Sequence, residues 1–266
     1  MKRVTGGARR CGHWVAVVST CSLMLVVATG PANSAGCSFE PQGEGRVVEI
    51  IDARTFRLAD GREVVLAGIE PVVTEKARRT SALSAILAGR DVTLRGEDDT
   101  PDRYGRQPAF VFLAPSETLV QGQLLAQGEA LFSGAVTDKD CASVLTAAEA
   151  EARQAKRGTW ADPTAIKNAE SPGDILTGIG RFTVVEGRVL SVRQAGATTY
   201  LNFGRSWTRG FAATISRRMV AAFEAAGTGV KSFENRRIRV RGLVEARGGP
   251  RIELLRVGQV ELLGGN

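Results

Sequence analysis

The sequence predicts a mainly β fold with interspersed helices (α+β), in which an OB-type five-stranded barrel is followed by a second OB-like β domain. Short apolar, β-branched segments between turn residues predict the strands, and longer segments with helical spacing predict the helices. The succession of strands, a helix and further strands occurs twice, which is the order of an OB-type barrel. With 266 residues and 43% hydrophobic content, the chain can bury one or two ordinary cores.

Residues 1–35 have the composition of a secretory signal peptide, with a basic start, an apolar run from Trp14 to Ala28 and small residues before Cys37. We therefore expect an exported protein, either periplasmic or secreted. An uncleaved anchor and a lipidated Cys37 are the alternatives, although the apolar run is shorter than the ~20 residues of a spanning helix. Cleavage would remove His13, the single histidine, so we expect neither imidazole catalysis nor histidine-bound zinc.

Cys37 and Cys141 are the two cysteines beyond residue 35. An even pair in an exported chain indicates a disulfide between them, and two buried thiols are the alternative. The bridge would close a loop of about a hundred residues, which is worth roughly 4 to 5 kcal/mol in the chain-entropy model.

The first domain, residues 43–162, is predicted to contain five strands and three helices. The expected strands are 47–51, 56–58, 64–69, 91–95 and 109–113, and the expected helices are 74–87, 119–127 and 142–156. Asp60-Gly61 predicts a tight hairpin turn, because this dipeptide accepts positive φ values. Gly89 is expected to end the first helix.

A second domain is predicted at residues 180–264, after a linker at 163–179 that is rich in proline and glycine. The expected strands are 184–192, with a bend at Gly187, and then 199–203, 211–215, 236–244 and 251–255. Ser216 is expected to cap a helix that Gly227 ends.

The charge is divided unequally between the two halves of the chain. Residues 36–165 hold 15 basic and 20 acidic side chains, a net charge of −5, whereas residues 166–266 hold 16 and 8, a net charge of +8. We therefore expect a polyanion to be attracted to the second domain.

Two segments, Ile50–Leu58 and Asp102–Arg106, resemble the signature of the thermonuclease, or staphylococcal-nuclease-like, family. The resemblance includes Val65–Val72 and covers roughly residues 44–162. It implies an OB-type barrel and calcium-dependent hydrolysis of phosphodiester bonds in DNA or RNA. In that family, carboxylates hold the calcium, a glutamate activates or orients water, and two arginines neutralise the phosphate.

Most of these site residues are replaced in this sequence. Arg54 stands where the first metal-binding aspartate belongs, and Val65 stands at the first phosphate-binding arginine. The catalytic glutamate falls on Val72–Val73. Arg106 is the retained arginine, and Glu70 is the one carried-over candidate for a metal ligand, so these two are the candidate catalytic residues.

We therefore predict an exported, non-catalytic protein that binds nucleic acid or another polyanion, or acts as a scaffold, without a metal or other cofactor. The alternative is a divergent calcium-dependent phosphodiesterase, for which Glu75 would offer a substitute carboxylate. In the altered site we expect a salt bridge between Arg54 and Glu70. Phosphate binding by Arg54 and Arg106 is the other possibility.

Alternating arginines and neighbouring aromatic residues suggest where a nucleic acid would bind. OB barrels bind single strands by stacking bases on aromatic rings beside a cationic groove. Aromatic residues in the core and a solvated arginine face are the alternative interpretation. The candidate nucleic-acid-binding residues are Tyr200, Arg205, Trp207, Arg237, Arg239 and Arg241.

Overall fold

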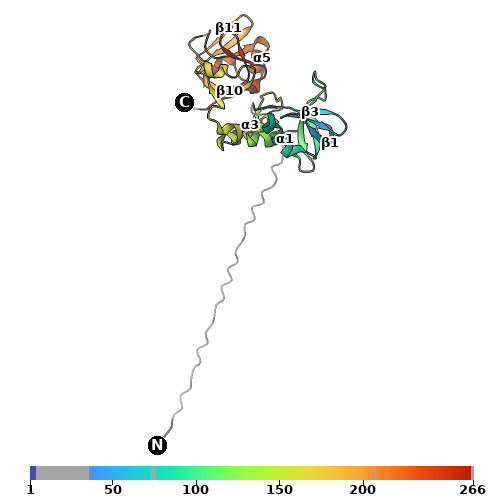
Figure 1. The fold of residues 1–266 in the computed structure, drawn as a ribbon. Coiled ribbons are helices and arrows are strands. Elements are labelled where there is room, and N and C mark those ends of the chain that lie inside the picture. The colour runs from blue at the N-terminus through green and yellow to red at the C-terminus, as the bar shows by residue number, and fades with distance from the viewer. Residues whose placement is uncertain (4–35, 73–75, 207, 265–266) are drawn as a thin grey trace. The chain divides into compact units, whose positions relative to one another are not determined.

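The computed structural model describes residues 1–3, 36–72, 76–206 and 208–264 (Figure 1). The chain separates into Met1–Pro31 and a compact unit from Ala32 to Asn266, which contains the elements given below. Most of the predicted signal peptide, the stretch 73–75 and Trp207 lie outside the described residues. Among the residues that the structure describes, the helices are too short or too polar to cross a membrane.

Five strands of the first domain close into a barrel. The strands of its sheet are β1 (Glu40–Ile50), β2 (Thr55–Leu58), β3 (Glu63–Leu66), β5 (Asp91–Gly96), β6 (Gln107–Leu113) and β7 (Thr118–Leu119). The hydrogen-bonded order is β3-β2-β1-β5-β6-β7, and β3 also pairs in parallel with β6, which closes the ring. This arrangement confirms the predicted OB-type barrel in an α+β fold.

Helices and a small second sheet complete the first domain. They are α1 (Lys76–Leu87), α2 (Val120–Gln127), α3 (Lys139–Gln154), the 3-10 helix η1 (Gly158–Ala161), and the paired strands β4 (Ile69–Pro71) and β8 (Ala130–Phe132). The helix α3 begins three residues before the predicted start at 142, because Asp138 caps it by accepting the backbone N–H of Cys141.

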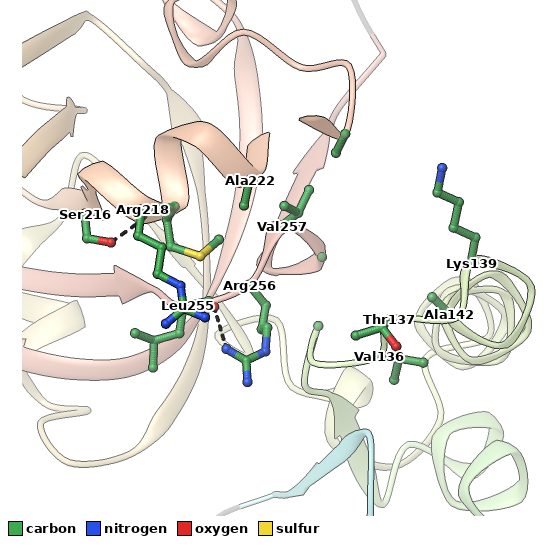
Figure 2. A pocket seen from close by; sticks show the side chains of 14 residues that line it. Val136, Thr137, Lys139, Ala142, Ser216, Arg218, Ala222, Leu255, Arg256 and Val257 are labelled. Carbon is green, nitrogen blue, oxygen red and sulfur yellow. Dashed lines mark hydrogen bonds between the residues drawn. The ribbon is translucent and has the colours of Figure 1, made fainter. Parts of the chain in front are cut away.

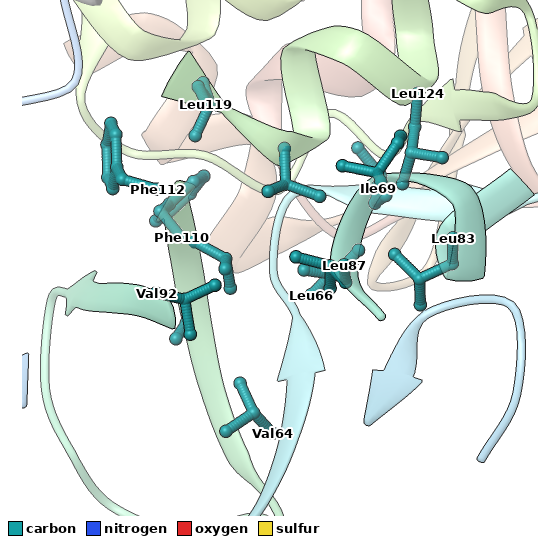
Figure 3. Close-up of a cluster of buried hydrophobic side chains, with 14 of the residues drawn as sticks. Val64, Leu66, Ile69, Leu83, Leu87, Val92, Phe110, Phe112, Leu119 and Leu124 are labelled. Atoms are coloured by element: carbon teal, nitrogen blue, oxygen red, sulfur yellow. The ribbon is translucent and has the colours of Figure 1, made fainter. Parts of the chain in front are cut away.

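Strand and helix side chains share one hydrophobic core in this domain (Figure 3). Leu83 and Leu87, one helical turn apart on α1, are fully buried, as is Leu66 on β3. Full burial of a leucine side chain contributes roughly 1.5 to 3 kcal/mol. Tertiary packing therefore holds the helices against the barrel.

The strands of the second domain pair in the same order as those of the first barrel, when the first order is followed as β1-β2-β3-β6-β5-β1. They are β9 (Ile166–Asn168), β10 (Phe182–Arg188), β11 (Ser191–Ala195), β12 (Thr198–Asn202), β13 (Ala212–Ser216), β14 (Arg237–Ala246), β15 (Pro250–Leu254) and β16 (Val260–Leu262). The order is β11-β12-β13-β15-β14-β10-β9, with β16 on β14, and β13 pairs in parallel with β15 as β3 does with β6. Ser216 caps α5 (Arg217–Ala225), and the 3-10 helices are η2 (Val230–Phe233) and η3 (Val257–Gln259).

The predicted strand 184–192 is broken, but not at Gly187. The break separates β10 from β11 at Val189 and Leu190. Gly187 lies inside β10, where an added Cβ would stand 2.4 Å from Cβ of Ala169. The glycine therefore permits close packing of this strand rather than a bend.

The segment 163–179, which was predicted to be a linker, contains regular secondary structure. The strand β9 pairs in parallel with β10, and α4 (Pro172–Leu176) buries Ile175 in the second core. Pro172 occupies the first turn of α4, where proline is well tolerated because it needs no hydrogen-bond donor there. The proline that suggested a linker instead begins a helix.

Cys37 and Cys141 form the predicted disulfide, which spans a sequence separation of 104 residues. It joins the segment before β1 to the first turn of α3, and both residues are buried. A sulfur in this bridge cannot also form a thioether, so the bridge is incompatible with a lipid on Cys37.

Candidate functional site

The turn between β1 and β2 presents Arg54 at the position where the resemblance implies a metal-binding carboxylate. Asp52 accepts the backbone N–H of Arg54 at 2.8 Å and so fixes the turn. Nη1 of Arg54 lies 2.9 Å from Oε1 of Glu70 on β4, and both side chains are partly exposed. The structure thus contains the predicted Arg54–Glu70 ion pair.

Arg106, the retained arginine, is held by Asp102 within its own loop. Its Nε and Nη2 both donate to Oδ2 of Asp102, at 2.9 and 2.7 Å. Asp102 also accepts the backbone N–H groups of Tyr104 and Arg106. The hydrogen bonds from the Arg106 side chain are the main reason why the pKa of the Asp102 carboxyl is lowered and the pKa of the guanidinium is raised.

This donor set does not suit calcium, which takes roughly six to eight oxygen ligands including carboxylates. A guanidinium replaces one carboxylate at Arg54, and it is already paired with the remaining candidate, Glu70. Among the described residues, no three His, Cys, Asp or Glu side chains are grouped so that they could hold a metal ion. Because Arg54 and Arg106 are each engaged by a carboxylate, they also do not form an unpaired arginine couple for phosphate.

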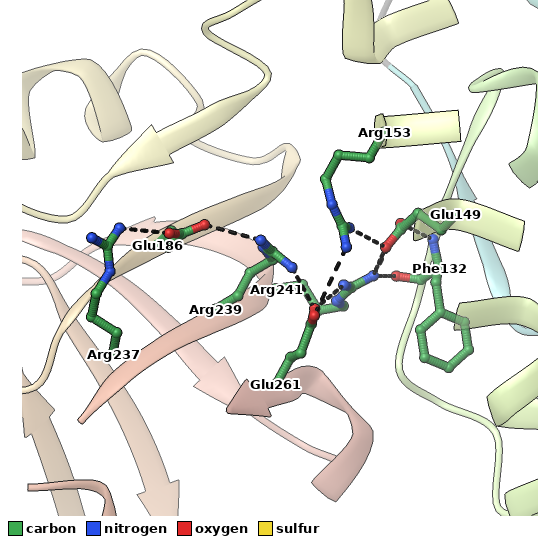
Figure 4. Close-up of polar contacts among 8 residues, drawn as sticks. All are labelled: Phe132, Glu149, Arg153, Glu186, Arg237, Arg239, Arg241 and Glu261. Atoms are coloured by element: carbon green, nitrogen blue, oxygen red, sulfur yellow. Dashed lines mark hydrogen bonds and ion pairs between the residues drawn. The ribbon is translucent and has the colours of Figure 1, made fainter. Parts of the chain in front are cut away.

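The arginines on β14 are paired with carboxylates as well (Figure 4). Arg237 and Arg239 donate to Glu186 on the neighbouring strand β10, at 2.6 and 3.0 Å. Arg239 also donates to Glu261 on β16 at 2.6 Å. The Arg239 side chain is 8% exposed, against 56% for Arg237, so only Arg237 of these two faces solvent.

Arg241, the third predicted arginine, is buried with a side-chain exposure of 2%. Its Nη1 donates to the carbonyl oxygen of Phe132 on β8 and to Oε2 of Glu149 on α3, both at 2.9 Å. Glu149 is fully buried and accepts the backbone N–H of Phe132. Arg153 joins this cluster 3.6 Å from Glu149, and burial is the main cause of its lowered pKa. Arg241 therefore connects the second domain to the first and is not available to a nucleic acid.

Tyr200 and Arg205 line one pocket of about 710 Å³, which Arg193 on β11 and Arg251 on β15 also line. Cζ of Arg251 lies 5.0 Å from the centroid of the Tyr200 ring. Within the described part of the chain, no carboxylate lines this pocket or pairs with its three arginines. Trp207, the other predicted aromatic residue, lies outside the described residues. Sequence reasoning missed Arg193 and Arg251, whose position depends on strand register.

A second cavity, of about 870 Å³, has a different chemistry (Figure 2). Met219 and Leu255 contribute apolar surface, and Lys139, Arg218 and Arg256 contribute positive charge. The residues that line it include no aromatic side chain. It therefore offers no ring on which a base could stack.

Comparisons with known proteins agree with the resemblance of the first domain to a nuclease family. Residues 74–162 match the family model described as staphylococcal nuclease homologue. Two proteins named "Uncharacterized endonuclease", from Escherichia coli O157:H7 and Escherichia coli, are each 28% identical to this chain over 124 residues, covering 44% of this chain and 77% of each relative. Residues 74–162 are therefore similar to the staphylococcal nuclease homologue family.

Proposed function

We propose that this protein is an exported, non-catalytic nuclease-like protein that binds nucleic acid or a related polyanion through its second domain. The Arg54–Glu70 ion pair carries the first part of this proposal. A positive guanidinium in place of a carboxylate removes a ligand and repels a divalent cation. The protein therefore works without a metal or other cofactor.

Charge and aromatic chemistry support the binding part. Residues 166–266 carry a net charge of +8, which attracts polyanions over a distance of about one Debye length. The pocket that Tyr200 and Arg205 line, called here the Tyr200 pocket, adds a ring and arginines that have no carboxylate partner among the described residues. Export is supported by the signal-like composition of residues 1–35 and by the Cys37–Cys141 disulfide.

The second candidate function is a divergent calcium-dependent phosphodiesterase. It is favoured by the retained Arg106 and by relatives named as endonucleases. Under this alternative, Arg106 would neutralise the phosphate, and Glu70 would break its ion pair with Arg54 and take part in the reaction. Both groups would then be essential to cleavage.

An assay with denatured DNA and RNA separates the two functions. The purified full chain is incubated with each substrate in the presence of calcium or of a chelator, beside the variants Arg106→Ala and Glu70→Gln. We expect no calcium-dependent cleavage by any of the three proteins. We also expect binding that weakens steeply as the salt concentration rises, because phosphate contacts release counterions.

The two variants distinguish cleavage by this protein from cleavage by a contaminating nuclease. Cleavage that requires calcium and disappears in Arg106→Ala and Glu70→Gln would overturn the non-catalytic proposal. A contaminating nuclease would instead cleave equally in all three preparations. Absence of any salt-sensitive binding to either nucleic acid would overturn the binding part.

A further inference from the structure

We infer that the Tyr200 pocket is a binding site for single-stranded nucleic acid, in which an unpaired base stacks on Tyr200 while adjacent phosphates contact Arg193 and Arg205. This inference rests on the proposed polyanion binding and names its site and its ligand class. The arginines of β14 are already paired with carboxylates, so we assign the binding of nucleic acid to a different set of arginines.

Strand register brings the residues of this site together. Tyr200 on β12 pairs directly with Arg193 on β11, and Asn202 pairs with Ser191. Paired residues point to the same face of a sheet, and residues two apart on a strand share that face. Leu201 between them is fully buried in the second core, so Tyr200 and Asn202 point away from that core, and Asn202 is itself only 8% exposed.

Among the described residues that line the Tyr200 pocket, no carboxylate neutralises the positive charge. Arg193, Arg205 and Arg251 line the pocket without a carboxylate among its described lining residues, whereas each arginine of β14 named above has a glutamate partner. Like charges that converge without a counter-charge favour an anion from outside.

The binding surface extends beyond the Tyr200 pocket. A neighbouring hollow of about 510 Å³ shares Leu190, Gly204 and Arg205 with the Tyr200 pocket and adds Arg209, together with one carboxylate, Glu170. A row of arginines along adjoining hollows matches the repeating phosphates of a chain better than a single small anion.

Stacking on Tyr200 requires a base whose face is free. In a duplex both faces of an internal base are covered by its neighbours, so an unpaired base is needed. Asn202 also lines the pocket, and its Nδ2 donates to Oγ of Ser191 at 3.3 Å. A sulfated polysaccharide would use the arginines but not the ring.

Fluorescence anisotropy with the full chain tests the site. The probes are a labelled single-stranded oligodeoxynucleotide of mixed sequence, the corresponding duplex and a labelled heparin fragment. We expect the single strand to bind tightest. Tyr200→Ala should weaken its binding about 10-fold, Tyr200→Phe should restore it, and Arg205→Ala should reduce the dependence of log K on log salt by roughly 0.7.

Arg218→Ala is the matched control, because Arg218 lies in the same domain and lines the cavity that lacks an aromatic side chain. It should leave the Kd within about 2-fold, because Arg218 is exposed and does not line the Tyr200 pocket, and exposed charges beyond the Debye length are largely screened. Circular dichroism of each variant verifies that it is folded.

The outcomes distinguish a failure of the Tyr200 site from a failure of the proposed binding function. If the protein binds single strands but Tyr200→Ala binds as well as the unchanged chain, the site is wrong and polyanion binding stands. Equal affinity for duplex or heparin, or an equal loss in Arg218→Ala and Arg205→Ala, would also overturn the site. If none of the probes binds, both the site and the proposed binding function fail.

Discussion

At the scale of single residues, Asp102 explains how the Asp102–Arg106 loop keeps its structure although other residues of the family's catalytic site are replaced. Its carboxylate accepts two hydrogen bonds from the Arg106 side chain and two from the backbone N–H groups of Tyr104 and Arg106. The loop is thus stabilised by its own members, and the structural role of Arg106 does not depend on a phosphate.

Asp102 should make stability depend on pH in the acid range. Its pKa is lower in the folded chain than in the unfolded chain, so the ionised carboxylate stabilises the fold fully above its ordinary pKa of about 4. This contribution is lost as the pH falls through the lower, folded value. Asp102→Asn should therefore be less stable than the unchanged chain at pH 7, and urea unfolding should show the difference shrinking below about pH 4.

Asp99→Asn provides the control, because Asp99 is exposed and its side chain forms no hydrogen bond or ion pair with the described residues. Its unfolding free energy should follow that of the unchanged chain at every pH. A deficit in Asp102→Asn that stays constant down to about pH 2 would contradict an ion pair as the cause.

Sequence reasoning succeeded for residues whose partners are implied by a motif. The Arg54–Glu70 ion pair could be predicted because both positions belong to one family signature. The partners of Arg241 could not, because Glu149 lies 92 residues earlier in the chain. Helical spacing did carry a signal, since Glu149 continues the buried series of Cys141 and Leu145 on α3.

At the scale of elements, the end of α2 depends on a glycine for two separate reasons. Gly128 has a φ of +72°, and its backbone N–H bonds to the carbonyl groups of Leu124 and Leu125. An added Cβ would also stand 2.2 Å from the carbonyl oxygen of Arg157. Conformation and close packing therefore both favour glycine at this position.

Gly89→Ala and Gly128→Ala should separate these two effects. Gly89 has a similar φ of +67°, but no atom lies within 4 Å of its added Cβ. Gly89→Ala should lower the free energy of unfolding by about 1 to 2 kcal/mol, the cost of a left-handed alanine. Gly128→Ala should cost clearly more in urea unfolding, and equal losses would show that the contact with Arg157 is unimportant.

Local sequence patterns predicted most elements of the first domain, but they failed where pairing is long-range: the predicted strand 64–69 is divided between β3 and β4, and β4 pairs with the unpredicted β8. Asp60-Gly61 marked the β2–β3 hairpin, and Gly61 indeed has a φ of +90°. The strand β9 is only three residues long and depends on its parallel partner β10 for its existence. Short strands of this kind lack a periodic signal of their own.

At the scale of the whole compact unit, buried charges connect parts of the chain that lie far apart in sequence. Arg241 on β14 reaches Glu149 on α3 and the carbonyl group of Phe132 on β8. The hydrogen bonds satisfy both charges, which would otherwise be costly to bury. The position of β14 against α3 is therefore specified by polar contacts as well as by apolar packing.

Glu149→Ala should destabilise the protein by about 3 to 5 kcal/mol in urea unfolding, because it leaves the Arg241 guanidinium buried without its main counter-charge. Arg237→Ala, which removes an exposed arginine of the same strand, should cost no more than about 1 kcal/mol. The double change Glu149→Leu/Arg241→Met should recover much of the loss, since it removes both charges. A loss in Glu149→Ala no larger than that in Arg237→Ala would contradict this role.

The redox state of the buried Cys37–Cys141 pair also indicates which compartment the chain has reached. A disulfide forms readily in an oxidising compartment and is kept reduced in a glutathione-rich one. Under the proposed export, molecules that have not yet left the reducing compartment would carry two thiols at these positions, and exported molecules would carry none. Counting alkylated cysteines by mass spectrometry, after rapid denaturation of cell fractions, thus tests the proposed export.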